Sequence, residues 1–176
     1  GNLAFLSCSN LTSVVFPDSL RSIGAGAFAG CGLTTVVIPA GVTSIGSDPF
    51  SCDGVESITV EKGNTVYHSA GNCLIETASK MLLYGCKNSV IPADGTVTSI
   101  GAWAFERCTS LTSITIPGSV KSIGYNAFYD CNNLTSITLP NSVTHIGDYA
   151  FEECSNLEYV YIGNNLTSVG GSGIFD

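Results

Sequence analysis

The chain has 176 residues and a formal net charge of −8, with 44% hydrophobic but only 11% charged residues. The hydrophobic content is enough for a core and excludes a disordered chain, because disorder needs low hydrophobicity and high charge. Only six residues are lysine or arginine, which disfavours nucleic-acid binding. No apolar run approaches the roughly 20 residues that span a bilayer, so we expect no membrane insertion in this segment.

The chain repeats itself at intervals of 22 or 23 residues from its beginning, except in the middle. A phenylalanine marks each regular unit, at Phe5, Phe28, Phe50, Phe105, Phe128 and Phe151. The best-kept unit reads A-F-x-x-C-x-x-L-T-S-I-T-I-P-x-S-V-x-S-I-G-x-x. A period of this length lies within the leucine-rich-repeat range of roughly 20–29 residues.

Residues 1–60 hold regular repeats, and so do residues 97–176. In the best-kept unit, residues 111–116 predict a strand that points Ile114 and Ile116 inward and Thr115 outward, and Pro117 ends it. The glycine after each Ser-Ile pair suits a tight turn with unusual φ and ψ. The Ala-Phe part predicts a turn or a short helical segment on the opposite side of the coil.

One turn cannot bury its apolar side chains alone, whereas stacked turns can bury them against each other. The fold class is therefore a repeat solenoid with short parallel strands on one face. In such a coil the phenylalanines should stand in a single file.

Residues 61–96 break the period and predict an irregular repeat that bears a β-hairpin. Two apolar runs, 73–77 and 80–86, surround a short polar turn, and the hairpin is expected to project from the solenoid. If residues 77–80 form the turn, Cys73 faces Tyr84. The Val90-Ile91-Pro92 segment then restores the regular pattern.

This repeating unit resembles that of the BspA-like leucine-rich repeat family, and the resemblance covers nearly the whole chain. The irregular stretch is also similar to one found in that family, at Asn64, Tyr67, Gly71, Leu74, Lys80 and Leu82. The resemblance implies a right-handed leucine-rich-repeat coil in a bacterial cell-surface or secreted protein, with its signal and anchor outside this segment. Both ends stop inside the pattern, so we expect residues 1–176 to be one solenoid domain from a longer array.

Six of the eight cysteines occupy one column of the repeat, at Cys8, Cys31, Cys52, Cys108, Cys131 and Cys154. Their side chains would run parallel, too far apart at Cβ for disulfides, so we expect buried free thiols that pack as small apolar groups. Pairing of Cys73 with Cys86 is out of register in the predicted hairpin. No C-x₂₋₄-C pair exists, so we expect no metal site.

Few residues suggest catalysis. His68 and His145 are the usual general-base candidates, but spacing places no nucleophile or carboxylate beside either of them. Gly24, Gly26 and Gly30 imitate a phosphate loop without its spacing. We therefore expect no catalytic residue and no cofactor, and the chain is predicted not to be an enzyme.

Two groups of residues depart from the otherwise small, uncharged outward positions. Glu158, Tyr159 and Tyr161 fill strand positions that carry threonine or serine elsewhere, and Trp103, Tyr125 and Tyr149 lie on adjacent turns. Tyrosine and tryptophan are enriched at interfaces, so these six are the candidate partner-binding residues. Alternatively, they cover the side of the coil or pack on further repeats.

The predicted function is a non-enzymatic interaction or adhesion module that binds host, matrix or other cell-surface proteins. The family resemblance supplies the adhesion role. The alternatives are a structural spacer that projects other domains and a carbohydrate-binding module, which would need aromatic residues in a groove with convergent polar groups.

Overall fold

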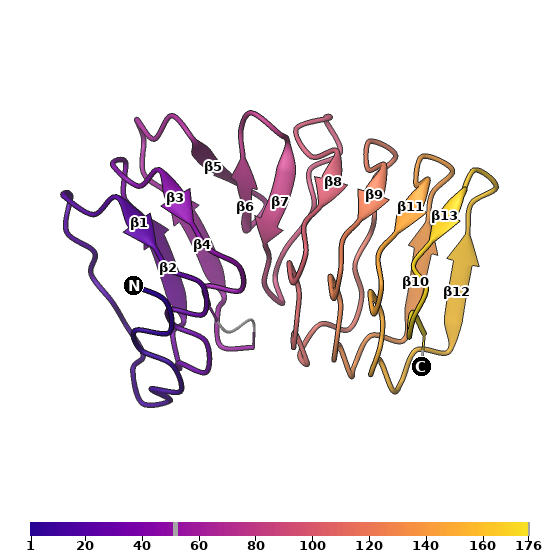
Figure 1. Ribbon diagram of the computed structural model, residues 1–176, viewed down its shortest axis with the longest axis horizontal. Helices are drawn as coiled ribbons and strands as arrows, with labels where there is room; N and C mark the ends of the chain where they lie inside the picture. Colours follow the sequence, from indigo (N-terminus) through magenta and orange to yellow (C-terminus); the bar gives the residue numbers. More distant parts are fainter. Residues whose placement is uncertain (51–52, 176) are drawn as a thin grey trace.

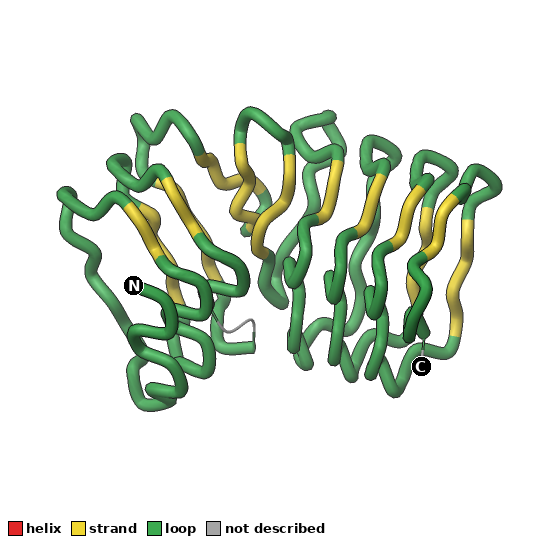
Figure 2. The backbone as a smooth tube through the Cα atoms, in the orientation of Figure 1, coloured by secondary structure: helices red, strands yellow, loops and turns green. Residues whose placement is uncertain are grey.

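The structure is a computed structural model, and it describes residues 1–50 and 53–175. Figure 1 shows turns of chain stacked side by side from the N-terminal to the C-terminal end, which makes a solenoid. Figure 2 shows only strands and loops, and the described residues contain no helix, hence none that could cross a membrane. The strands are β1 (Ser22–Ile23), β2 (Thr35–Ile38), β3 (Ser44–Ile45), β4 (Ser57–Val60), β5 (Tyr67–Ala70), β6 (Cys73–Glu76), β7 (Met81–Tyr84), β8 (Ser99–Ile100), β9 (Ser122–Ile123), β10 (Ser136–Leu139), β11 (His145–Ile146), β12 (Tyr159–Ile162) and β13 (Ser168–Val169).

One face carries the strands that the repeat predicts. β2 pairs with β4 and β10 pairs with β12, both in parallel and one repeat apart, as in the pairing of Ser136 with Tyr159. Along β2 and β10, exposed and buried residues alternate. This alternation confirms which positions of the strand face the core and which face outward.

The best-kept unit is itself an exception, because residues 111–116 form no strand. The predicted direction of its side chains is right, since Ile114 and Ile116 are buried and Thr115 is exposed. The preceding turn explains the loss of pairing. There Ser89 accepts from the N–H of Cys86 (2.8 Å) and donates to the carbonyl of Asn72 (2.6 Å), which curls the chain where a strand would lie.

A second ladder of short parallel strands runs along the Ser-Ile positions, where the sequence predicted only a turn. β1 pairs with β3, and β8, β9, β11 and β13 follow one another in parallel. The glycine after each pair is needed for close approach and not for an unusual φ. A Cβ on Gly124 would lie 2.6 Å from the backbone nitrogen of Ala102 in the turn before.

The Ala-Phe part is a run of turns, which corrects the suggestion of a short helix. Residues on both sides of the pair have positive φ, as at Trp103 (58°) and Arg107 (54°). Alternate N–H groups therefore point along the solenoid axis. Those of Trp103, Phe105 and Arg107 donate to the next turn at 2.9, 2.8 and 2.7 Å. Hydrogen bonds between turns replace the bonds within one segment that a helix needs.

The phenylalanines stand in file, as predicted. Phe5, Phe28 and Phe50 stack in the first turns, and Tyr84 meets the last of them edge to face at 5.5 Å. Phe105, Phe128 and Phe151 then stack with ring centroids 5.0 and 5.1 Å apart and planes within 3°. Phe175 extends this second stack at 5.4 Å.

The hairpin is part of the sheet and does not project from the coil. β5, β6 and β7 pair antiparallel, and β7 pairs in parallel with β8, so a seven-stranded sheet joins the irregular repeat to the regular turns that follow. A bulge shifts the register, and Leu74 rather than Cys73 faces Tyr84. Leu74, Ile75 and Leu82 are fully buried, which keeps the hairpin in the core.

The cysteine column is partly as expected. Cys31, Cys131 and Cys154 are buried free thiols that donate to carbonyls of the preceding turn at 3.0, 3.2 and 3.2 Å. Cys8 is free but exposed.

The prediction of buried free thiols is wrong for one of the two remaining cysteines of the column and is not tested for the other. Cys108 is disulfide-bonded, so the prediction of a free thiol is wrong there. Its turn follows the irregular repeat, so it lacks the regular preceding turn on which that prediction rested. Cys52 lies outside the described residues.

The cysteines of the hairpin, Cys73 and Cys86, are buried and free. Burial raises the pKa of the Cys73 thiol to about 12, which keeps it protonated near neutral pH.

Candidate interaction surfaces

The first predicted cluster lies on β12, which pairs on one side with β10. Tyr159 and Tyr161 are each 71% exposed and stand in register with Ser136 and Thr138. Glu158 precedes them, also exposed, and its N–H donates to the carbonyl of Thr135 at 2.9 Å. The strand thus holds two large aromatic side chains away from the core, on the outward face of a fixed backbone.

The second predicted cluster is a contiguous aromatic ladder. Tyr125 meets Trp103 at 5.4 Å and Tyr149 at 5.6 Å, both edge to face. Tyr125 is 41% exposed, whereas Trp103 and Tyr149 are half-buried. The ladder lies on the turns, and among the described residues no ring contact joins it to the tyrosines of β12.

The two histidines lie far apart on the surface. His68 Nδ1 is 2.9 Å from Thr77 Oγ1, beside a cavity of about 270 Å³ that Lys80 and Asp94 also line. Hydrogen bonds from Thr96 lower the pKa of the Asp94 carboxyl. His145 Nδ1 is 3.1 Å from Ser168 Oγ. Among the hydrogen bonds of the described residues, none joins either ring to a carboxylate.

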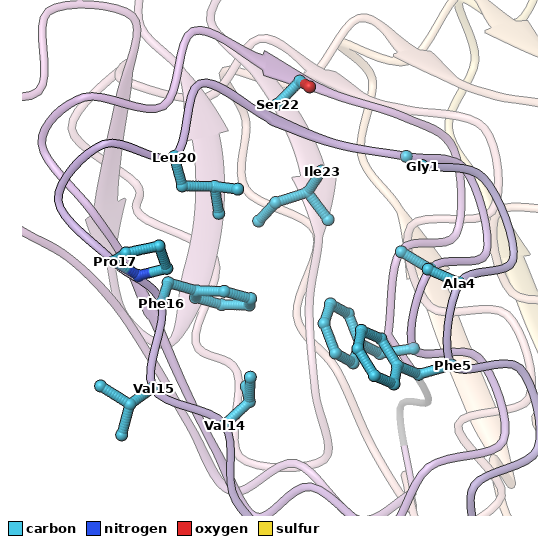
Figure 3. Close-up of a pocket in the computed structure, with 13 residues that line it drawn as sticks. Gly1, Ala4, Phe5, Val14, Val15, Phe16, Pro17, Leu20, Ser22 and Ile23 are labelled. Carbon is cyan, nitrogen blue, oxygen red and sulfur yellow. The ribbon is translucent and has the colours of Figure 1, made fainter.

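An apolar cavity of about 250 Å³ opens among the first turns. Figure 3 shows Phe5, Phe16, Leu20 and Ile23 around it. The buried Phe28 also lines the cavity. Leu3, Phe5 and Leu6 beside it are 56, 46 and 49% exposed. The cavity is continuous with the core and has no convergent polar side chains, so it lacks the means to orient a polar ligand.

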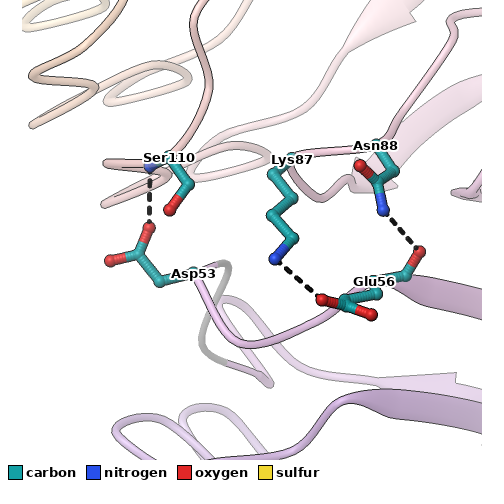
Figure 4. Close-up of polar contacts among 5 residues, drawn as sticks. All are labelled: Asp53, Glu56, Lys87, Asn88 and Ser110. Carbon is teal, nitrogen blue, oxygen red and sulfur yellow. Dashed lines mark hydrogen bonds and ion pairs between the residues drawn. The ribbon is translucent and has the colours of Figure 1, made fainter.

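Polar contacts connect the turn before the irregular repeat with that repeat and with the turn after it, as Figure 4 shows. Lys87 forms an ion pair with Glu56 at 2.9 Å, and the Asn88 side chain donates to the carbonyl of Glu56 at 3.3 Å. Asp53 accepts from the N–H of Ser110 at 3.1 Å. These contacts hold residues 53–56 against two segments that lie far along the chain.

A model of the BspA type leucine rich repeat region matches residues 1–79 and 76–175, with six copies. The chain belongs to this family. The BspA-type repeat is a protein-interaction fold, and its period accounts for the columns of phenylalanine, leucine and isoleucine described above. No curated protein matches the chain.

Solved structures of bacterial leucine-rich repeat proteins share the fold. The pneumococcal vaccine antigen PcpA is 24% identical, with a TM-score of 0.84 over 97% of this chain and 44% of its own. A leucine-rich repeat protein from Eubacterium ventriosum is 26% identical, with a TM-score of 0.77 over 91% of this chain and 48% of its own.

A leucine-rich cell surface protein from Faecalibacterium prausnitzii is 28% identical, with a TM-score of 0.56 over 92% of this chain and 56% of its own. The BspA-type repeats described here therefore span about half the length of these three proteins.

One cavity of the repeat region is acidic. Asp48, Asp53, Glu106 and Arg107 line a space of about 360 Å³. Burial raises the pKa of Asp48 to about 6, against the opposing charge of Arg107. Burial also raises the pKa of Glu106 to about 6, and the charges of Asp48 and Asp130 add to this. Burial in the cavity therefore disfavours the ionised forms of Asp48 and Glu106.

The raised pKa values predict that these two groups stabilise the fold in mild acid. The folded state binds their protons more tightly than the unfolded chain does, so this contribution is fully present below the unfolded pKa and is lost as the pH rises through about 6. We expect the free energy of unfolding of the wild type, relative to Asp48→Asn, to increase between about pH 7.5 and about pH 5. Urea unfolding of both proteins measures the difference, and a pH-independent difference would contradict the prediction.

Proposed function

We propose that this repeat region is a non-enzymatic module that binds proteins through the outward face of its solenoid, as part of a bacterial cell-surface or secreted adhesion protein. The observation that carries the proposal is the exposure of Tyr159 and Tyr161 on one strand of a rigid stack of turns. Tyrosine at such a place offers apolar area with a polar tip and loses little side-chain entropy on binding.

The surroundings of the tyrosines support contact with an extended protein surface. The neighbouring outward positions, Ser136 and Thr138, are short and uncharged, so a partner can approach the tyrosine rings along the whole strand. Glu158 adds one carboxylate at the beginning of the strand, which favours a partner with a basic group there. Host, matrix and other cell-surface proteins are the partners that the family resemblance suggests.

The aromatic ladder is the second anchor of the proposal. Its rings meet edge to face and Trp103 is half-buried, so the ladder offers ring edges and the Tyr125 face rather than one broad flat platform. Rings that meet edge to face form no broad flat platform for the stacking of a sugar ring, and carbohydrate binding therefore ranks below protein binding here.

A binding assay on a panel of purified matrix and host cell-surface proteins tests the proposal. For a partner that binds the wild type, Tyr159→Ala/Tyr161→Ala should weaken binding at least about tenfold, because tyrosines that become buried in an interface are common hot spots. Trp103→Ala tests the ladder in the same way. Val37→Ala is the matched control, since Val37 is 42% exposed at the position of β2 equivalent to Tyr161.

Unchanged affinity of both tyrosine and tryptophan variants would reject the assigned residues. Failure of the wild type to bind any protein of the panel would favour the spacer. Binding to a glycan array that is lost in Trp103→Ala would instead favour a carbohydrate-binding module.

A further inference from the structure

A groove separates the irregular repeat from the regular turns that follow it. Residues 87–93 form one wall and residues 113–118 form the other, around a space of about 590 Å³. This inter-turn groove lies on the face where β2, β4, β10 and β12 pair in the other turns. It therefore occupies the place of a missing strand pairing.

The wall at residues 112–116 has an open backbone edge. Within the described chain, none of the N–H groups of residues 112–116 donates to a backbone carbonyl, and none of their carbonyls accepts a backbone bond. In two other turns, the residue equivalent to Thr112 pairs with the turn before, since Glu56 donates to Thr34 and Glu158 donates to Thr135, both at 2.9 Å. In β4 and β12, the bonds to the turn before end with those from Glu61 to Ile38 at 2.9 Å and from Gly163 to Leu139 at 2.8 Å. By the period of two, the N–H and carbonyl groups of the equivalent Ser113 and Thr115 point into the groove.

The opposite wall cannot close this edge. Its backbone is held elsewhere, because the N–H of Val90 donates to the carbonyl of Gly71 at 2.8 Å and Ser89 is bonded to Cys86 and Asn72. The two walls therefore stay apart, and the open edge keeps its hydrogen-bonding groups. Unpaired backbone groups beside an apolar surface are a template for an added strand.

The chemistry of the groove selects its occupant. Val90 is 71% exposed at the rim, and Ile91, Ile114 and Pro117 line the space. Lys87 is the charged lining residue, and Glu56 already neutralises it. The net charge of −8 disfavours an acidic occupant.

We propose that the inter-turn groove binds an extended segment of another protein as an added β-strand, with apolar side chains at alternate positions and a neutral or basic net charge. The backbone of the segment pairs with Ser113 and Thr115, and its apolar side chains lie over Ile91 and Ile114. Backbone pairing supplies the affinity, and the alternate apolar positions supply the specificity. This site uses neither Tyr159 and Tyr161 nor the aromatic ladder, so an experiment can reject it without rejecting the proposed function.

Amide hydrogen exchange on the whole chain tests the open edge. In the free protein, the N–H of Thr115 should exchange at least about tenfold faster than that of Tyr161, the equivalent residue of β12, which pairs with Thr138 of β10. Equal protection of the two amides would show that the edge is already closed and would overturn the proposal.

Selection from a display library tests the occupant. The library holds extended peptides of about six residues, with apolar residues at alternate positions and variable charge between them. Enriched peptides should be neutral or basic, should slow the exchange of Thr115, and should lose at least about tenfold in affinity for Gly118→Trp.

Gly118 lines the groove, and a Cβ there meets no atom within 4 Å, so Gly118→Trp fills the opening without disturbing the core. Gly171→Trp is the matched control, because Gly171 has equally open surroundings outside the groove. Tyr159→Ala/Tyr161→Ala should keep full affinity for the selected peptides. The proposal is overturned if no peptide is enriched, or if enriched peptides bind Gly118→Trp as tightly as they bind Gly171→Trp.

Discussion

Replacing Phe128 with alanine should lower the free energy of unfolding by about 3–5 kcal/mol. Phe128 is fully buried, and its ring is stacked between Phe105 at 5.0 Å and Phe151 at 5.1 Å. The turns on both sides are held by backbone hydrogen bonds, as from Phe128 to Ala150 at 2.8 Å, so they cannot collapse into the space that the ring leaves. Chemical denaturation of the variant and the wild type measures the loss.

Phe5→Ala is the matched control for this prediction. Phe5 occupies the same column and also stacks at 5.0 Å, on Phe28, but it is 46% exposed and has one ring neighbour. Its replacement should cost clearly less than that of Phe128. Equal losses for the two variants would show that the stack does not act as a packed core.

Replacing Gly85 with alanine should be strongly destabilising for the addition of a single methyl group, with a loss of about 3 kcal/mol. A Cβ on Gly85 would overlap Cε1 and Cζ of Phe105 and lie 2.8 Å from Cδ1. The ring of Phe105 cannot move away, because it is fully buried and lies within 3° of parallel to Phe128. Gly85 therefore provides the space in which the second phenylalanine stack begins.

Two further variants separate this steric effect from a general glycine effect. Gly118→Ala should change stability by less than about 0.5 kcal/mol, because its Cβ meets no atom within 4 Å. Gly85→Ala combined with Phe105→Leu should be less destabilised than the sum of the two single losses, since leucine lacks the ring atoms that the new Cβ meets. Additive losses would mean that Gly85 is needed for a reason other than Phe105.

The predicted binding residues could be placed from the sequence because they lie in regular turns. Alternation along the strand puts Tyr159 and Tyr161 outward, and the spacing of one repeat brings Trp103, Tyr125 and Tyr149 onto adjacent turns. Both placements agree with the structure. What these side chains bind stays a prediction, because the identity of a partner depends on chemistry outside the chain.

The inter-turn groove could not be predicted in this way. It exists because Ser89 occupies the position that isoleucine or valine fills in other turns and bonds to Cys86 and Asn72. A serine hydroxyl can bond locally or point into solvent, and only the position of Asn72 decides between the two. In the same irregular repeat, the hairpin lies within the seven-stranded sheet and does not project. This arrangement is the more stable one because it buries Leu74, Ile75 and Leu82.

The sequence by itself determined the solenoid, the inward columns and the file of phenylalanines, because a repeat of constant length places equivalent side chains over one another. Only the tertiary structure decided where the backbone bonds between turns. It revealed the Ser-Ile ladder, the turns of the Ala-Phe part and the unpaired edge at residues 112–116. The physical reason is that side-chain burial follows the period along one chain, whereas each backbone hydrogen bond depends on the conformation of two turns at once.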